Sequence, residues 1–270
     1  MSENVAATPC YEVFAIRYAE RDGWRRNAFQ GGDAHDGPLP MDYFVWVIRN
    51  SERTFVVDLG FTREVAERRK RNYIRSPKEG LAMIGVDARS VRDVVVTHMH
   101  YDHVGTYDEF PQAVFHVQED EMSFATGKYM RYERFRHGYE LDDVLGMVRL
   151  VYDDRVAFHA GATTLAPGVS IHRIGGHTKG CQCVRVHTGR GWMVLASDCS
   201  HYYENFEQNR FYASLFDVGE QADGFETMRA LARTPRHIVP GHDPLVMQRY
   251  PAAGRELAGI VARLDYEPEG

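Results

Sequence analysis

Four potential metal ligands lie within six residues, in the segment His98-Met99-His100-Tyr101-Asp102-His103. At the composition of this chain, the pattern H-x-H-x-D-H arises by chance only ~0.002 times per chain. Neutral imidazoles and a carboxylate are the ligands that bind Zn²⁺ and similar metals. The segment directly follows an apolar, β-branched run at residues 91–96. Because a strand that ends in a turn can aim alternate side chains outward from the rim of a sheet, we predict a metal site at a sheet edge.

Three further candidate ligands have the same placement. His177, Asp198 and His242 each come shortly after another apolar, β-branched run, and glycines lie beside His177 and His242. Together with His98, His100, Asp102 and His103 they make seven potential ligands. Seven ligands exceed the four of one tetrahedral shell, so the sequence favours a site with two metals.

Apolar, β-branched runs recur along the whole chain and predict strands. Between them, Thr62 can cap a helix that runs to about Asn72. Pro251 can begin a second helix, and a third is expected from Gln221 to Ala232. Strands in the majority, with helices interspersed and no linker, predict one layered α/β domain over residues 1–270. The predicted strands are residues 11–16, 43–48, 54–57, 91–96, 113–117, 169–174, 183–186, 192–196 and 237–239.

The composition excludes several classes of protein. With 44% hydrophobic and 26% charged residues, the chain is neither disordered nor collagen-like, and its net charge of −6 argues against a nucleic-acid partner. The longest apolar run, residues 43–48, is too short to cross a bilayer, and the first ten residues show no secretory signal. Four cysteines do not make a disulfide framework. We therefore expect a cytoplasmic protein with no membrane partner.

The ligand motifs together resemble the metallo-β-lactamase superfamily, which implies an αββα sandwich of two mixed sheets with metals at one edge. The match runs in order from His98 to His242, and the turn Asp58-Leu59-Gly60 resembles the D-x-G turn of that family. A Glu in place of His100 would indicate the di-iron, oxygen-reducing branch, so His100 favours hydrolysis. The best-known β-lactamases place Cys where this chain has Asp198, which favours a substrate other than an antibiotic.

Two further stretches are similar to N-acyl-homoserine lactonases. Residues 176–182 read G-H-T-K-G-C-Q, like the G-H-T-x-G-x-Q run of those enzymes, and residues 204–207 also resemble one of their segments. The resemblance implies two Zn²⁺ ions, or Mn, Fe or Co in their place. It also implies that Asp58 orients a ligand imidazole through its free N–H. By the same resemblance, His98, His100 and His177 bind one metal, Asp102, His103 and His242 bind the other, and Asp198 bridges the two.

One position departs from the lactonase pattern. Those enzymes place a Tyr three residues after the bridging Asp, where its hydroxyl donates a hydrogen bond to the substrate carbonyl. This chain has His201 there, followed by Tyr202 and Tyr203. Three alternatives remain open: His201 is the donor, a neighbouring Tyr is the donor, or the substrate differs.

These features predict a metal-dependent hydrolase that opens a lactone. Two metals roughly 3.5–4 Å apart can share a water and lower its pKa, which gives a bridging hydroxide for attack on the acyl carbon. Asp102 or Asp198 could carry the proton of that water away. An acyl-homoserine lactone is the first substrate expected, and a small aromatic lactone the second; a homodimer is compatible with the sequence. The alternatives are a glyoxalase II-type thioesterase, an iron persulfide dioxygenase and a metal-binding module without catalysis.

Three segments allow two interpretations each. Residues 124–139, rich in aromatics and arginines, could form a wall over the substrate, although an amphipathic helix packed on the sandwich is the preferred interpretation. The charged run at residues 67–71 could bind an anion, although a solvated helix face is preferred. The turn-rich residues 31–38 could cover the pocket, although an ordinary surface loop is preferred.

Overall fold

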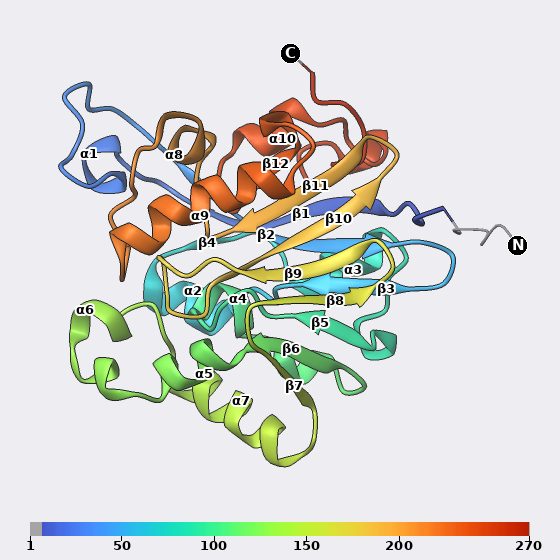
Figure 1. The fold of residues 1–270 in the computed structure, drawn as a ribbon, viewed down its shortest axis with the longest axis horizontal. Helices are drawn as coiled ribbons and strands as arrows, with labels where there is room; N and C mark the ends of the chain where they lie inside the picture. Colours follow the sequence, from blue (N-terminus) through green and yellow to red (C-terminus); the bar gives the residue numbers. More distant parts are fainter. Residues whose placement is uncertain (1–6, 270) are drawn as a thin grey trace, which may run out of the picture.

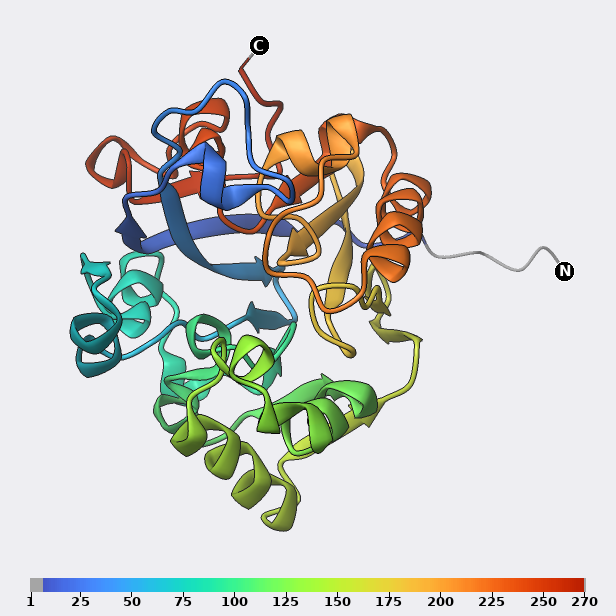
Figure 2. The same ribbon diagram turned by 90° about the vertical axis from the view of Figure 1, so that its left-hand side faces the viewer.

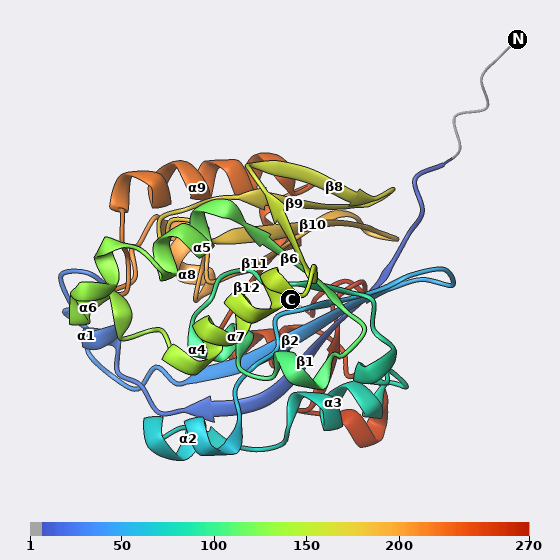
Figure 3. The same cartoon turned by 90° about the horizontal axis from the view of Figure 1, so that it is seen from below.

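Two β-sheets packed face to face form the centre of the computed structural model, which describes residues 7–269 (Figure 1). Helices lie on both outer sides, and the view in Figure 3 shows the resulting four layers, with α9 above one sheet and α2 and α3 below the other. The predicted αββα sandwich is therefore confirmed. The expected absence of a secretory signal concerns residues 1–10, of which residues 1–6 lie outside the described range.

The first sheet has eight strands in the order β13-β1-β2-β3-β5-β6-β7, with β4 paired to β1. Strands β3, β5, β6 and β7 run parallel to one another, whereas the pairs that involve β1 and β2 are antiparallel. The strands are β1 (Glu12–Arg21), β2 (Met41–Arg49), β3 (Thr54–Val57), β4 (Asn72–Tyr73), β5 (Asp93–Val95), β6 (Val114–Gln118), β7 (Val156–His159) and β13 (Val261–Arg263).

The second sheet has five strands in the order β12-β11-β10-β9-β8. Only the β11–β12 pair is parallel, so these two strands end at the same edge of the sheet. The strands are β8 (Ala162–Ala166), β9 (Val169–Arg173), β10 (Gln182–Thr188), β11 (Gly191–Ser197) and β12 (Ile238–Pro240).

Alternation along the strands divides the apolar side chains between two cores. In β1, Val13 and Ala15 face the second sheet, whereas Phe14, Ile16 and Tyr18 face the helices on the outer side. The central strands are nearly continuous runs of apolar residues, because both of their faces are covered. The covering helices are α1 (Arg25–Ala28), α2 (Arg63–Arg69), α3 (Pro77–Met83), α4 (Tyr101–Val104), α5 (Glu119–Ala125), α6 (Glu133–Arg136), α7 (Leu141–Tyr152), α8 (Tyr203–Gln208), α9 (Val218–Leu231) and α10 (Leu245–Arg249).

The helix predicted to start at Pro251 does not form, and the prediction was wrong. The chain makes a 3₁₀ turn at Arg255–Leu257, and Gly259 then adopts a φ of 72°. Residues Val261–Arg263 become β13, which pairs with β1. A left-handed residue interrupts a helix, and the free edge of β1 offers backbone hydrogen bonds that the last part of the chain satisfies.

The other two predicted helices form with changed ends. Thr62 caps α2 as expected, its hydroxyl accepting a hydrogen bond from the Val65 amide. The helix ends at Arg69 because Lys70 takes a left-handed conformation with a φ of 55°. The third helix, predicted from Gln221, starts earlier, where Asp217 caps the N-terminus of α9. No helix within residues 7–269 combines the length and the apolar character needed to span a bilayer.

Candidate metal centre

The seven predicted ligands come from segments that follow strands of both sheets. The chain leaves β5 and enters α4, which places His98 before the helix, His100 at its N-cap, and Asp102 and His103 in its only turn. The parallel strands β3 and β5 end at one edge, as do β11 and β12 of the facing sheet. Figure 2 looks onto the end of the sandwich where α1 and α6 lie, and Arg134 and Phe135 of α6 line the cavity at the site.

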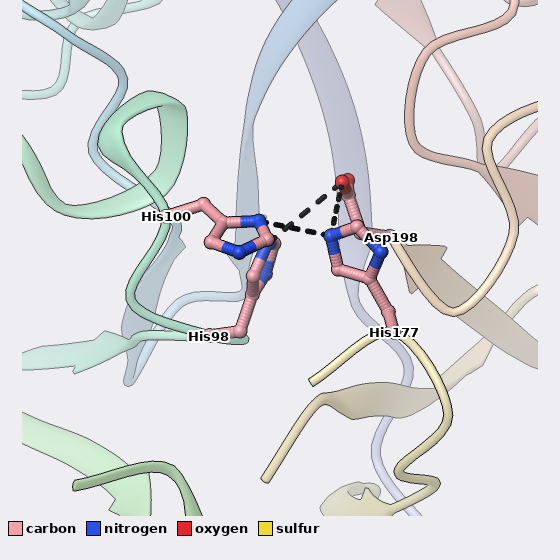
Figure 4. A group of neighbouring side chains, drawn as sticks. All are labelled: His98, His100, His177 and Asp198. Carbon is pink, nitrogen blue, oxygen red and sulfur yellow. Dashed lines mark hydrogen bonds and ion pairs between the residues drawn. The ribbon is translucent and has the colours of Figure 1, made fainter. Parts of the chain in front are cut away.

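One group of ligands contains His98, His100, His177 and Asp198, whose side chains converge from separate segments in Figure 4. The Nε2 atom of His177 lies 2.9 Å from Nδ1 of His100 and 3.2 Å from Oδ2 of Asp198. The Nε2 atom of His98 lies 3.8 Å from the same Asp198 oxygen. Three imidazoles and one carboxylate oxygen therefore face a common point.

A second group contains Asp102, His103 and His242, and it faces the other oxygen of Asp198. The Oδ1 atom of Asp198 lies 2.8 Å from Nε2 of His242 and 3.2 Å from Nε2 of His103. Oδ2 of Asp102 lies 3.7 Å from Nε2 of His242. Asp198 thus directs one oxygen toward each group, which is the arrangement of a bridging carboxylate.

The donor atoms of both groups fit metal ions. Nε2 of His98, Nε2 of His103 and Oδ1 of Asp198 are buried and have no hydrogen-bond partner within residues 7–269. Buried polar atoms without partners are costly, and ligation by a cation removes that cost. Imidazole and carboxylate donors suit Zn²⁺ and its neighbours in the first transition series.

Electrostatics differ between the two groups. Burial and the neighbouring imidazoles hold the pKa values of His98 and His100 well below the ordinary value, so both rings are neutral. Burial also disfavours charge on His103 and His242, but Asp198 and Asp102 outweigh it and raise the pKa of both. The second group therefore retains protons more readily than the first, and a metal bound there would have to displace them.

A family model of the metallo-beta-lactamase superfamily matches residues 40–252, a range that contains all seven ligands. The chain belongs to the metallo-beta-lactamase superfamily.

It is similar to the N-acyl homoserine lactonase AttM of Azorhizobium caulinodans, with 26% identity over 237 residues that cover 79% of this chain and 85% of the relative. It is also similar to the AttM lactonase of Rhizobium johnstonii, with 28% identity over 63% of this chain and 65% of the relative.

Solved structures of the superfamily share the fold. A quorum-quenching N-acyl homoserine lactone lactonase superposes with a TM-score of 0.72 at 19% identity, covering 86% of this chain and 92% of the other. AidC, a dizinc quorum-quenching lactonase in complex with a product, has a TM-score of 0.65 at 14% identity, covering 87% of this chain and 88% of the other. The family predicted from the motifs is confirmed, and the names of the relatives bear out the prediction of a metal-dependent hydrolase.

Asp58 holds a ligand of the second group in place, as the D-x-G resemblance implied. Its Oδ2 lies 2.7 Å from Nδ1 of His103 and accepts hydrogen bonds from the hydroxyls of Thr97 and Ser197. Its Oδ1 accepts a hydrogen bond from the Thr97 amide. Asp58 and Ser197 have φ values of 60° and 46°, so both turns next to the ligands adopt a left-handed backbone that is uncommon for residues other than glycine.

Glu121 was not predicted from the sequence, yet it connects two of the ligand segments. Oε1 of Glu121 accepts hydrogen bonds from the Met99 amide and the Tyr139 hydroxyl, both at 2.9 Å. Oε2 accepts hydrogen bonds from the Thr178 hydroxyl and the Gly180 amide. Glu121 is fully buried and therefore ties the His98–His100 turn to the turn that carries His177. In the sequence, Glu121 is only one of three consecutive acidic residues, 119–121, in the first turn of α5, and no local pattern distinguishes it from the other two.

The structure brings His201, but neither adjacent tyrosine, to the ligands. Nε2 of His201 lies 3.0 Å from Oδ2 of Asp198. Burial lowers the pKa of His201 to about 4 although Asp198 opposes the shift, so its ring is neutral. The Tyr202 hydroxyl instead points to the carbonyl of Pro40, and the Tyr203 ring packs beneath the guanidinium of Arg249.

Tyr212, also missed from the sequence, supports His201 from behind. The two rings stack with centroids 4.0 Å apart and an interplanar angle of 26°. The Tyr212 hydroxyl lies within hydrogen-bonding distance of the Asp198 carbonyl and of the Gln221 side chain. These contacts orient both His201 and the segment that carries Asp198.

A cavity of about 340 Å³ opens above the ligands and includes His100, Asp102, His177, Asp198 and His242 in its lining. Residues 124–139 do not form the single amphipathic helix that was preferred; they contain the end of α5, a 3₁₀ turn and α6. Several of their side chains line the cavity, as the wall interpretation requires, whereas residues 31–38 form a loop outside its lining. The wall side chains are Phe124, Arg134, Phe135 and His137.

Proposed function

We propose that this chain is a dinuclear metal-dependent hydrolase that opens a lactone, with two Zn²⁺ ions as its cofactor. The observation that carries the proposal is Asp198, whose two oxygens face two separate groups of ligands. The first ion would be held by His98, His100 and His177, and the second by Asp102, His103 and His242. The relatives named N-acyl homoserine lactonase support a lactone as the substrate.

When bound, the two ions supply Lewis acidity, which activates water and polarises the carbonyl oxygen of the substrate. Asp102 and Asp198 line the cavity, and either carboxylate could accept the proton of a water activated there. Burial would raise the pKa of both carboxyls, but the neighbouring histidines outweigh it and lower the pKa of both, so both are ionised.

His201 is the side chain that we propose as the hydrogen-bond donor to the substrate. Its neutral imidazole lines the cavity and carries one N–H, which points to the ionised Asp198 in the structure and would become available to the substrate when Asp198 binds metal. It can donate a hydrogen bond to the carbonyl oxygen as charge develops there. Tyr202 and Tyr203 do not fit this role. The Tyr202 hydroxyl points to the carbonyl of Pro40, and the Tyr203 hydroxyl is buried without a partner among residues 7–269.

The test combines metal analysis with a hydrolysis screen. Purified protein is analysed for bound metals and assayed with a pH indicator on acyl-homoserine lactones of several chain lengths, simple γ- and δ-lactones, aromatic lactones and a glutathione thioester. We expect about two Zn per chain and strong turnover of one lactone class, abolished by chelation. Turnover of the thioester alone would instead indicate a glyoxalase II-type enzyme, and one bound Fe without hydrolysis would indicate a dioxygenase.

A further inference from the structure

Four arginines line the cavity above the metal centre: Arg21, Arg69, Arg71 and Arg134. Two of them belong to the charged run at residues 67–71, for which a solvated helix face was the preferred interpretation. That interpretation holds for Glu67, Arg68 and Lys70, which are exposed, but the side chains of Arg69 and Arg71 line the cavity. The left-handed turn at Lys70 ends α2 and sends the chain back, so Arg71 lies on the cavity side.

The four arginines differ in whether a carboxylate already neutralises them. Arg69 pairs with Glu140 at 2.7 Å and so has its counter-ion. Arg21, Arg71 and Arg134 have no carboxylate within 4.0 Å among residues 7–269. The carboxylates that line the cavity are Asp102 and Asp198, which belong to the metal centre. The cavity therefore contains an excess of positive charge on its upper walls.

Arg71 is the best placed of the three for a ligand. Its Nε donates to the Tyr101 hydroxyl at 2.9 Å, and its Nη1 donates to the Arg69 carbonyl at 2.7 Å. These bonds orient the planar guanidinium and leave Nη2 without a partner in the described part of the chain. Tyr101 in turn contacts the Tyr43 hydroxyl, and the Tyr43 ring lies 5.2 Å from that of His242. Arg71 thus lies two side chains away from a metal ligand.

Part of the cavity wall is apolar. Phe124, Phe135 and Phe216 line it and pack against one another edge to face, with the ring of Phe216 4.8 Å from Phe124 and 5.4 Å from Phe135. A ligand in this cavity can therefore contact the candidate metal ligands, aromatic rings and unpaired guanidinium groups.

We propose, given the lactonase function above, that the substrate is an anionic lactone. Its lactone carbonyl lies at the metal centre, its apolar part lies against Phe135 and Phe216, and an oxyanion on its side chain pairs with Arg71, assisted by Arg21. A guanidinium whose partners are neutral and whose position is fixed binds a carboxylate or phosphate through charge-assisted hydrogen bonds. A neutral acyl chain would leave these cations in a partly buried cavity without a counter-ion, which costs free energy.

The test uses three γ-lactones that differ only at the end of one side chain: a carboxylate, a phosphate and a neutral carboxamide. We expect kcat/KM for one anionic lactone to exceed that for the carboxamide about 10- to 100-fold, the range of a hydrogen bond between charged groups. The ratio of the two values should fall at least about 10-fold in Arg71→Met, recover partly in Arg71→Lys, and stay unchanged in Arg68→Met, an exposed neighbour that does not line the cavity. The anionic lactone with the higher kcat/KM identifies the oxyanion of the substrate as a carboxylate or a phosphate.

Equal kcat/KM values for the anionic and neutral lactones, or a ratio that Arg71→Met leaves unchanged, would overturn the inference while the lactonase function stands. If no lactone is hydrolysed, the proposed function fails, and binding decides the inference separately. Calorimetry on the zinc-loaded protein then compares glutarate with butyrate. Binding of glutarate about 10-fold tighter than butyrate, lost in Arg71→Met, would support the anion site; equal affinities would contradict it.

Discussion

The floor and the upper walls of the cavity are built in different ways. The floor consists of seven side chains that follow the strands, almost all of them buried, and several are held by a further partner such as Asp58 or Tyr212. The walls consist of arginines and aromatic rings from short helices, loops and the end of β1, and these side chains are mostly half-buried or exposed. A rigid floor suits a reaction common to many relatives, whereas walls that tolerate substitution can adapt to one substrate.

The largest effect is expected at the floor, from Asp198→Asn. Asparagine keeps the size of the side chain but removes the charge that faces both groups of ligands. We expect loss of about one metal per chain and a fall in lactonase kcat/KM on the order of 10³-fold. Metal analysis and steady-state kinetics measure both, with Asp223→Asn on the exposed side of α9 as the control. Full metal content together with full activity would rule out the bridging role.

A smaller effect is expected one contact away, from Asp58→Asn. The amide cannot accept all the hydrogen bonds that Thr97, Ser197 and His103 make to the carboxylate. We expect metal affinity of the second group to fall about 10- to 100-fold, the usual effect of removing a partner that orients a ligand. Competition with a chelator measures it. If both metals were lost equally, Asp58 would be supporting the whole fold and not the His103 group.

The walls should respond differently, and Phe216→Ala tests this. Removing a half-buried aromatic ring takes away apolar contact but no part of the metal centre. We expect KM for the best substrate to rise about 5- to 30-fold, which corresponds to roughly 1–2 kcal/mol of lost burial, with little change in kcat. Steady-state kinetics on metal-loaded protein separates the two constants. A fall in kcat with unchanged KM would show that this wall takes part in the reaction and not only in binding.

The smallest effect is expected outside the cavity, at Asp143 in α7, a buried carboxylate that contrasts with Asp58. Its Oδ2 has no hydrogen-bond partner within residues 7–269, and burial raises its pKa to about 7. The unfolded chain loses this proton near pH 4, so the folded state binds more protons between about pH 4 and 7, and stability falls as the pH rises through that window.

Asp143→Asn removes this ionisation. We expect the variant to melt a few degrees above the parent at pH 8, at roughly 2–4 °C per kcal/mol, and the difference to vanish toward pH 4. Thermal melts at both pH values measure it. If the difference in melting temperature between variant and parent were the same at pH 4 and pH 8, the Asp143 carboxyl would have no raised pKa in that range.

The sequence by itself predicted the fold class, which is confirmed, and seven candidate ligands, which the structure brings together. Strands can be predicted from local patterns of apolar residues, and His98, Asp198 and His242 come shortly after such strands. The convergence of these three side chains at one edge follows from how strands pack in a sheet. Local patterns failed where distant segments decide the outcome. Residues 261–263 became a strand because the edge of β1 was free, although their spacing also fits a helix.

The tertiary structure alone decided which side chains reach the cavity. Arg71 lines it only because Lys70 reverses the chain, and Glu121 holds Met99 and Thr178 across 22 and 57 positions of sequence. His201 rather than Tyr202 faces Asp198, although the two are neighbours in the chain. Side-chain identity and spacing encode which chemistry is available. Long-range packing selects which of those groups meet, because their burial depends on contacts that no short stretch of sequence contains.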